Sequence, residues 1–175
     1  MKAASEIIKV IIENKAPKLS LTSPNQIPKK IQIKTWCAHV LTNLNSLNNL
    51  KKSSEIYIGF INIKTIHDLN LTYRHKDRPT NVLSFPFELP PGLSQLDPLD
   101  QLNQPNQLGD ILICPEVILK ESQEQNKLFQ DHLAHMVIHG TLHLLGYDHE
   151  NDSEAEIMEA LEIKFLNYFN IPNPY

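Results

Sequence analysis

Apolar and polar side chains alternate along several short stretches of this chain, which is the pattern of a strand that buries one face. The clearest example has Ile56 and Ile58 on one side, followed by Phe60 or Ile61. A β-branched run near the N-terminus and two apolar runs in the middle of the chain also have the length and composition of strands. The pattern predicts four strands, at residues 7–13, 55–63, 81–87 and 108–114.

Other stretches repeat apolar residues at the three- and four-residue spacing of a helix. The first is expected to pack on the sheet through Trp36, and its apolar positions are Ile31, Trp36, Val40, Leu41 and Leu44. Pro115 suits the first turn of a later helix, and Asp152 or Ser153 suits the N-cap of the last. The last helix is expected to bury Ile157, Met158, Leu161, Phe165 and Phe169. Five helices are predicted, at residues 29–47, 65–73, 116–125, 128–145 and from 152 onward.

The connection between the third and fourth predicted strands, residues 88–107, is longer than most connections in compact domains. It is rich in Pro, Gln, Asn and Leu. This composition gives little reason for one fixed conformation, so we favour partial disorder. A lid is the alternative interpretation of the same segment.

Length and composition indicate one domain spanning residues 1–175, since a chain of 175 residues can bury about 70% of its unfolded surface around a single core. Cys37 and Cys114 lie far apart, and Cys114 follows an apolar run, which favours buried free thiols over a disulfide. Charged residues interrupt residues 1–15, and no later run approaches a membrane span. We therefore expect a cytoplasmic protein without a signal peptide.

The net charge of −4 conceals a division between the two halves of the chain. Residues 1–80 hold 13 Lys and Arg against 5 Asp and Glu, whereas residues 81–175 hold 3 against 15. Attraction between the halves is one interpretation. The other is a basic surface for an anionic polymer, and its contributors would be Lys29, Lys30, Lys34, Lys51, Lys52, Arg74, Lys76 and Arg78.

The candidate chemistry lies in residues 139–149, which read HGTLHLLGYDH. His139 and His143 share one face of a helix, Gly146 can end that helix in a left-handed conformation, and the returning chain can bring His149 back. Neutral imidazole nitrogens bind zinc, and three protein ligands leave a fourth position open for water, as in catalytic sites. The sequence therefore predicts a catalytic metal site, although a buried helix with merely hydrogen-bonded histidines remains an alternative.

His135 offers a rival set with His139 and His143 along the same helix. Positions eight apart on a helix are separated by roughly 12 Å, too far for both His135 and His143 to reach one ion. We therefore interpret His135 as a packing residue or as a partner of a ligand.

Several segments resemble the YbeY family of bacterial ribosomal RNA maturation factors and endoribonucleases. They are residues 69–74 (LNLTYR), 79–86 (PTNVLSFP) and 139–149, together with Gly109-Asp110 before a strand and residues 152–162 after the histidines. The resemblance covers about residues 55–170. One departure is residues 88–107, a connection that is usually shorter in the family. With the predicted elements, the resemblance implies an α+β fold with a small mixed sheet, helices packed around it and the metal at one end.

The resemblance also implies a function: a metal-dependent, single-strand-specific endoribonuclease in 16S rRNA 3′-end maturation and in quality control of 70S ribosomes. His139, His143 and His149 would hold one Zn²⁺ per chain, and Arg74 would be the catalytic cation beside it. Lys76, Arg78 and Asp110 are candidate contacts to RNA or a partner, although Asp110 could instead only fix a turn. Expected partners are single-stranded RNA, rRNA and the ribosome, with a small-subunit ribosomal protein and a ribosome-associated GTPase.

Bases could stack on Tyr73 and Phe87, although both aromatic residues are more typical of a core. No general base follows from the spacing.

Two other functions compete with RNA cleavage. The spacing of His139, His143, Gly146 and His149 is that of the metzincin peptidases, and Met158 follows downstream. However, Gly140 occupies the position of their general-base glutamate, and Asp148 or Glu150 are weak substitutes. Alternatively, zinc could be structural in a non-catalytic ribosome-assembly factor, with a carboxylate such as Asp148 as fourth ligand.

Overall fold

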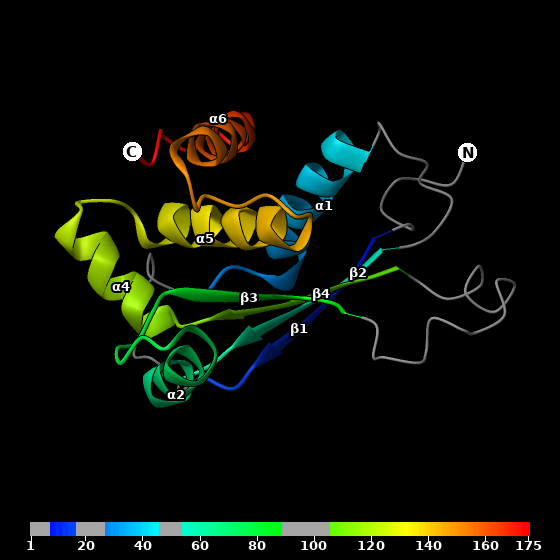
Figure 1. Ribbon diagram of the computed structural model, residues 1–175. Helices are drawn as coiled ribbons and strands as arrows, with labels where there is room; N and C mark the ends of the chain where they lie inside the picture. The colour runs from blue at the N-terminus through cyan, green and yellow to red at the C-terminus, as the bar shows by residue number, and fades with distance from the viewer. Residues whose placement is uncertain (1–7, 17–26, 46–53, 89–105) are drawn as a thin grey trace, which may run out of the picture.

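The computed structural model describes residues 8–16, 27–45, 54–88 and 106–175 (Figure 1). The elements, in chain order, are β1 (Ile8–Asn14), α1 (Lys30–Asn45), β2 (Ser54–Phe60), α2 (Ile63–Arg74), β3 (Val82–Pro86), β4 (Asn106–Ile113), α4 (Pro115–Glu124), α5 (Phe129–Leu144) and α6 (Asp152–Tyr168). Within these residues the predicted α+β fold of four strands and five helices is confirmed. Most of the 88–107 connection, residues 89–105, lies outside the described residues.

The four strands form one mixed sheet in the order β1-β2-β4-β3. β1, β2 and β4 run parallel, and β3 is antiparallel to β4, with Val82 opposite Ile113 and Phe85 opposite Asp110. Because neighbouring residues of a strand face opposite sides, Ile111 and Ile113 share one face of the sheet while Leu112 takes the other. The sheet therefore supports two hydrophobic layers.

The main core lies between the sheet and α5. Ile58 and Ile111 of the strands and Ile138 of α5 are fully buried there, and Trp36 of α1 packs into the same core, as predicted. Figure 1 shows α5 lying between the sheet and α6, with α1 on the same side. A smaller cluster forms on the other face, where Ile66 of α2 packs with Leu83. This packing holds α5 and the C-terminal end of α2 against the same edge strand, β3.

Helical spacing predicted the helices themselves but not every residue on their buried faces. Ile31 and Ile157 were expected to be buried, and both are exposed. At 100° per residue, Ile31 lies about 200° around α1 from the buried Ile33, and Ile157 lies about 100° around α6 from the buried Met158. The N-cap of α6 is Asn151, whose Oδ1 accepts a hydrogen bond from the Glu154 N–H at 3.0 Å, and not Asp152 or Ser153.

Cys37 and Cys114 are both buried and free, as predicted. Burial raises the pKa of the Cys37 thiol to about 12 and that of Cys114 to about 11, so both thiols stay protonated near neutral pH. Among the helices of the described residues, none is both long enough and apolar enough to cross a membrane.

Candidate metal centre

The C-terminal end of α5 carries the first two histidines and turns the chain back. The Gly146 N–H donates to the His143 carbonyl at 3.0 Å, and the Tyr147 N–H donates to the Leu142 carbonyl at 3.1 Å. This pair of bonds is a Schellman motif, which requires a left-handed residue after the helix. Gly146 has φ +87°, so the predicted left-handed glycine is confirmed.

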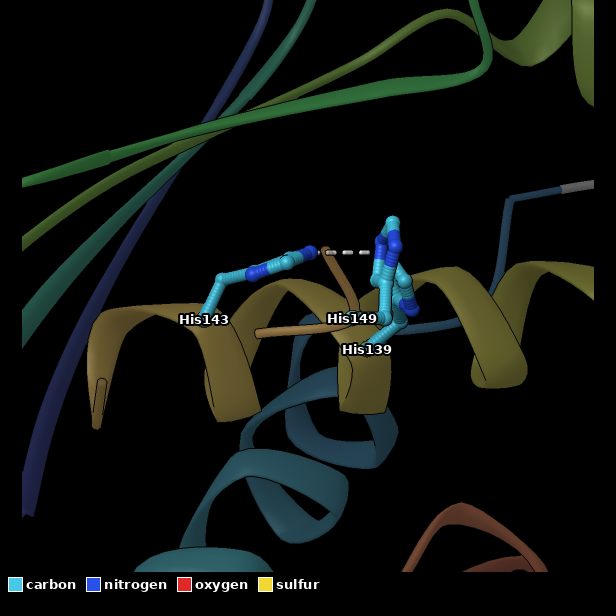
Figure 2. A group of neighbouring side chains, drawn as sticks. All are labelled: His139, His143 and His149. Carbon is cyan, nitrogen blue, oxygen red and sulfur yellow. Dashed lines mark hydrogen bonds between the residues drawn. The ribbon is translucent and has the colours of Figure 1, made fainter. Parts of the chain in front are cut away.

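The reversed chain brings His149 back to α5 (Figure 2). Its ring centroid lies 5.4 Å from that of His139 and 5.1 Å from that of His143, and the latter two are 4.5 Å apart. Each of the three rings offers one nitrogen within 4.8 Å of the others. The structure therefore brings the three predicted ligands together, and their role as zinc ligands stays a prediction.

The hydrogen bonds behind the rings determine which nitrogens face one another. His139 Nδ1 lies 2.7 Å from Glu162 Oε1, and His143 Nδ1 lies 2.9 Å from the Tyr147 carbonyl oxygen. A carboxylate and a carbonyl only accept, so each neutral ring carries its proton on Nδ1 and a lone pair on Nε2. The two Nε2 atoms lie 3.0 Å apart, as the dashed line in Figure 2 marks. Two lone pairs at this distance repel unless a cation lies between them.

A shared proton is a poor choice for that cation near neutral pH. Burial, together with the neighbouring His139 and His149, lowers the pKa of His143 to about 4. A metal ion fits better, because two nitrogens bound at 2.0–2.1 Å to one tetrahedral zinc are about 3.3 Å apart. The donor set and its spacing therefore suit a zinc ion.

Glu162 of α6 is a member of the site that the sequence prediction missed. Its carboxylate accepts from His139 Nδ1 and, at 2.7 Å, from His135 Nε2. Burial alone would raise the pKa of Glu162, but the hydrogen bonds from His135 and His139 outweigh it and lower the pKa to about 2. His135 thus bonds to Glu162, the carboxylate that supports the predicted ligand His139. This agrees with the sequence interpretation of His135 as a packing or supporting residue and not a ligand. A lone acid on the apolar face of the last helix was the signal that could have revealed Glu162.

A cavity of about 610 Å³ opens over the three histidines, and three cationic residues and the acidic Asp148 and Glu150 line it. Arg74, Lys76 and Arg78 line it together with His139, His143 and His149. Arg74 is the last residue of α2, and the left-handed His75, with φ 55°, ends the helix there. The next turn is held by Asn70, a buried residue whose Nδ2 donates to the Arg78 carbonyl at 2.7 Å and which the sequence prediction also missed.

Asp110 is not brought together with the other candidates. It lies on β4, opposite Phe85 and Tyr57, and it is not among the residues that line the cavity. Burial raises the pKa of its carboxyl group. Any contact that Asp110 makes to RNA or a partner would therefore lie outside the cavity.

The sequence favoured a core position for the two candidate stacking residues, but the structure places both at the surface. Tyr73 is 62% exposed and Phe87 is 46% exposed. The Tyr73 ring packs edge-on against Phe85, with centroids 5.2 Å apart. An aromatic ring supported on one side and open on the other is available for stacking.

Comparison with known proteins identifies a family and a related fold among solved structures. The family described as Endoribonuclease YbeY matches residues 20–170, which extends the resemblance towards the N-terminus. The solution structure of TM1509 from Thermotoga maritima covers 96% of this chain and 95% of that one, with 23% identity and a TM-score of 0.51. At this identity the similarity shows the fold alone.

A histidine cluster that could hold a metal ion, beside three cationic residues of one cavity, suits a hydrolase that acts on an anionic substrate. The chain belongs to the YbeY endoribonuclease family. Membership indicates an RNA-cleaving hydrolase of ribosomal RNA maturation.

Proposed function

We propose that the protein is a zinc-dependent, single-strand-specific endoribonuclease that acts in 16S rRNA 3′-end maturation and in late quality control of 70S ribosomes. One zinc ion per chain would be held by His139, His143 and His149. The observation that carries the proposal is the close approach of the Nε2 atoms of His139 and His143, 3.0 Å apart, in a cavity that Arg74, Lys76 and Arg78 also line.

Zinc held by three histidines would supply Lewis-acid activation of water and of a phosphoryl oxygen near neutral pH. Three neutral imidazoles leave its fourth position open. No further His, Cys, Asp or Glu of the described residues joins the group. This open position is what a hydrolytic site needs.

The cations of the cavity would bind the substrate. Arg74 is proposed to pair with the phosphoryl group in the transition state, because a planar guanidinium can donate two parallel hydrogen bonds to phosphate. Lys76 and Arg78 would contact neighbouring phosphates of the strand. Unpaired bases could then stack on the exposed Tyr73 and Phe87, which would favour single strands.

The wider setting belongs to the same proposal. The excess of positive charge in residues 1–80 would draw in rRNA and the ribosome. A small-subunit ribosomal protein and a ribosome-associated GTPase would be partners, with Asp110, an exposed residue of the inner strand β4, as a candidate contact. A cytoplasmic location is supported by two buried free thiols.

The packing of Gly140 argues against a metzincin-like peptidase. A Cβ atom at this position would lie 2.8 Å from Ile111 Cγ2 and 3.1 Å from Ser84 Oγ. A side chain at residue 140 would therefore crowd the sheet, and the glycine that stands there has no group that could accept a proton. The general base of that peptidase class has no equivalent at this position.

The position of Asp148 argues against a closed, structural zinc site. The nearest approach of its carboxylate to His143 is 3.9 Å, to Nδ1. That nitrogen is on the opposite side of the ring from the Nε2 atom that faces His139. Asp148 is therefore badly placed to act as fourth ligand.

The decisive experiment combines metal analysis with cleavage of unstructured and fully paired RNA. We expect one zinc per chain and cleavage of the unstructured RNA, both lost in His143→Ala and both kept in the matched control His67→Ala. Arg74→Ala should keep zinc and thermal stability but lose cleavage by about 10²-fold or more. Lys64→Ala, on the first turn of the same helix, is its control.

Two results would refute the proposal. The first is RNA cleavage that separates from the protein on further purification, which would favour a non-catalytic assembly factor. The second is cleavage of denatured protein or peptide libraries by the zinc-loaded sample, which would favour a peptidase.

A further inference from the structure

Glu162 is an unusual residue for the interior of this protein. Its relative exposure is 0%, and it is the one acidic residue that is buried in the part of the chain that the structure describes. Moving a carboxylate away from water is costly unless it is paired and hydrogen-bonded. A residue in this position therefore needs partners that compensate its charge.

Three donors surround the carboxylate. His139 Nδ1 lies 2.7 Å from Oε1, and His135 Nε2 lies 2.7 Å from Oε2. The Tyr175 hydroxyl also donates to Oε2. With one imidazole on each oxygen, the carboxylate cannot rotate away from His139 without losing a bond to His135.

This arrangement acts on His139 through its proton. Because the carboxylate only accepts, it holds the proton on Nδ1 and leaves the Nε2 lone pair directed at His143 and His149. A carboxylate behind a ligand imidazole also makes the ring a stronger donor to a metal. Glu162 thus favours the ring orientation and the tautomer that a cation site needs.

Glu162 also places a buried negative charge behind His139, whereas the hydrogen-bond partner behind His143 is uncharged. His143 Nδ1 is held by the neutral backbone carbonyl of Tyr147, and the nearby carboxylate of Asp148, 3.9 Å away, is half exposed to solvent. Three neutral imidazoles bring no negative charge to a divalent ion, whereas Glu162 places one directly behind His139. This buried charge is complementary to a cation at the three histidines.

A second metal ion among His135, His139 and Glu162 is a less suitable interpretation of the same group. Their ligand atoms lie close enough together for an ion to be considered. However, each nitrogen is 2.7 Å from a carboxylate oxygen, which is shorter than the roughly 3.3 Å between two ligands of one tetrahedral zinc. The distance instead matches a charge-assisted hydrogen bond.

We propose that Glu162 is a positioning residue of the metal centre, which fixes the Nδ1–H tautomer of His139 and balances the charge of the ion that the three histidines hold. The proposal rests on the proposed function, since it requires a metal at His139, His143 and His149. It adds a role for α6, which carries none of the three histidines.

The first test measures zinc affinity by competition with a chromophoric chelator, in the full-length chain and without RNA. Glu162→Gln should bind zinc about 10- to 100-fold more weakly than the wild type. Glu159→Gln is the matched control, because this exposed acid lies one turn earlier on α6 and lines a small cavity together with Glu162 and His139. It should bind zinc as the wild type does, and both chains should hold at most one ion.

The outcomes separate this inference from the proposed function. If wild type and Glu162→Gln bind zinc equally, the role of Glu162 is refuted while the metal site stands. A second ion that disappears in Glu162→Gln would also refute it, in favour of a second metal site. If the wild type binds no zinc at all, the proposed function fails first.

A second measurement needs no variant and therefore does not depend on folding of Glu162→Gln. Long-range ¹H–¹⁵N spectra of the metal-free wild type report which nitrogen of each imidazole carries the proton. His139 should show the Nδ1–H form, and Glu162→Gln, if folded, should gain the Nε2–H form. An Nε2–H tautomer of His139 in the metal-free wild type would overturn the inference.

Discussion

Gly140 of α5 and Ile111 of β4 are in such close contact that a Cβ atom on the glycine would lie 2.8 Å from Ile111 Cγ2. This contact allows the helix that carries two of the three histidines to lie directly on the sheet. It also explains why a glycine stands inside a helix, where it costs about 1 kcal/mol relative to alanine.

Gly140→Ala should therefore destabilise the protein even though alanine is the better helix former. Overpacking a well-packed core typically costs about 1–3 kcal/mol, which exceeds or cancels the gain in helix propensity. Urea denaturation should show a lower free energy of unfolding, by about 1 kcal/mol. An increase of about 1 kcal/mol would mean that Ile111 moves aside freely and that the contact is unimportant.

Removal of the metal should lower the thermal stability of the wild type. A ligand at 100 times its dissociation constant stabilises the folded state by about 2.7 kcal/mol, equivalent to roughly 5–10 °C in a domain of this size. A chelator should produce this shift in the wild type and none in His143→Ala. Equal melting temperatures of the wild type with and without chelator would argue against a zinc site at the three histidines.

Lys76 and Arg78 should contribute to RNA binding through phosphate contacts. For single strands, the logarithm of affinity falls with the logarithm of salt concentration by about 0.7 per neutralised phosphate. Lys76→Ala and Arg78→Ala should each reduce the slope by about that amount in metal-free protein, where RNA stays intact. Lys120→Ala, on α4 and outside the cavity, should leave the slope unchanged. If neither Lys76→Ala nor Arg78→Ala changed the salt dependence of RNA affinity, the RNA would bind outside this cavity.

Glu121 of α4 should contribute stability that depends on pH. Burial alone would raise its pKa, but the hydrogen bonds from His132 Nε2 at 2.7 Å and Asn81 Nδ2 at 3.0 Å outweigh it and lower the pKa below 4.5. The unfolded chain then binds a proton at a higher pH than the folded one. The contribution is therefore present above about pH 4.5 and lost as the pH falls through the lower folded-state pKa.

Glu121→Gln should accordingly be less stable than the wild type near pH 7, by roughly 1–2 kcal/mol, with the difference shrinking below pH 4.5. Denaturation at a series of pH values measures this difference. Glu124→Gln, which changes an exposed acid of the same helix, should show little effect at any pH. A difference that stays constant down to pH 3 would mean that ionisation of Glu121 is irrelevant.

The strands and helices were predictable because their signals are local. The alternation of Ile56 and Ile58 and the spacing around Trp36 identified elements that the structure contains. The gathering of the three histidines was predictable for the same reason. It depends on one helical turn and a left-handed Gly146, all within eleven residues.

The exact faces of the helices were less predictable. Spacing groups residues on one side of a helix, but the neighbouring elements decide how wide a stripe is covered. The exposure of Ile31 and Ile157 and the burial of Glu162 are cases of this kind. A carboxylate on a covered stripe is interpretable only once its partners are known.

By itself, the sequence determined the secondary structure and the three imidazoles that converge at the end of α5, because both follow from backbone geometry over a few turns. Only the tertiary structure decided what surrounds them. Glu162 lies 23 residues from His139, and Arg74 ends α2, which precedes β3, β4 and α4 in the chain. Their positions result from the packing of α6 and α2 against distant elements, and no local periodicity encodes which distant side chains meet.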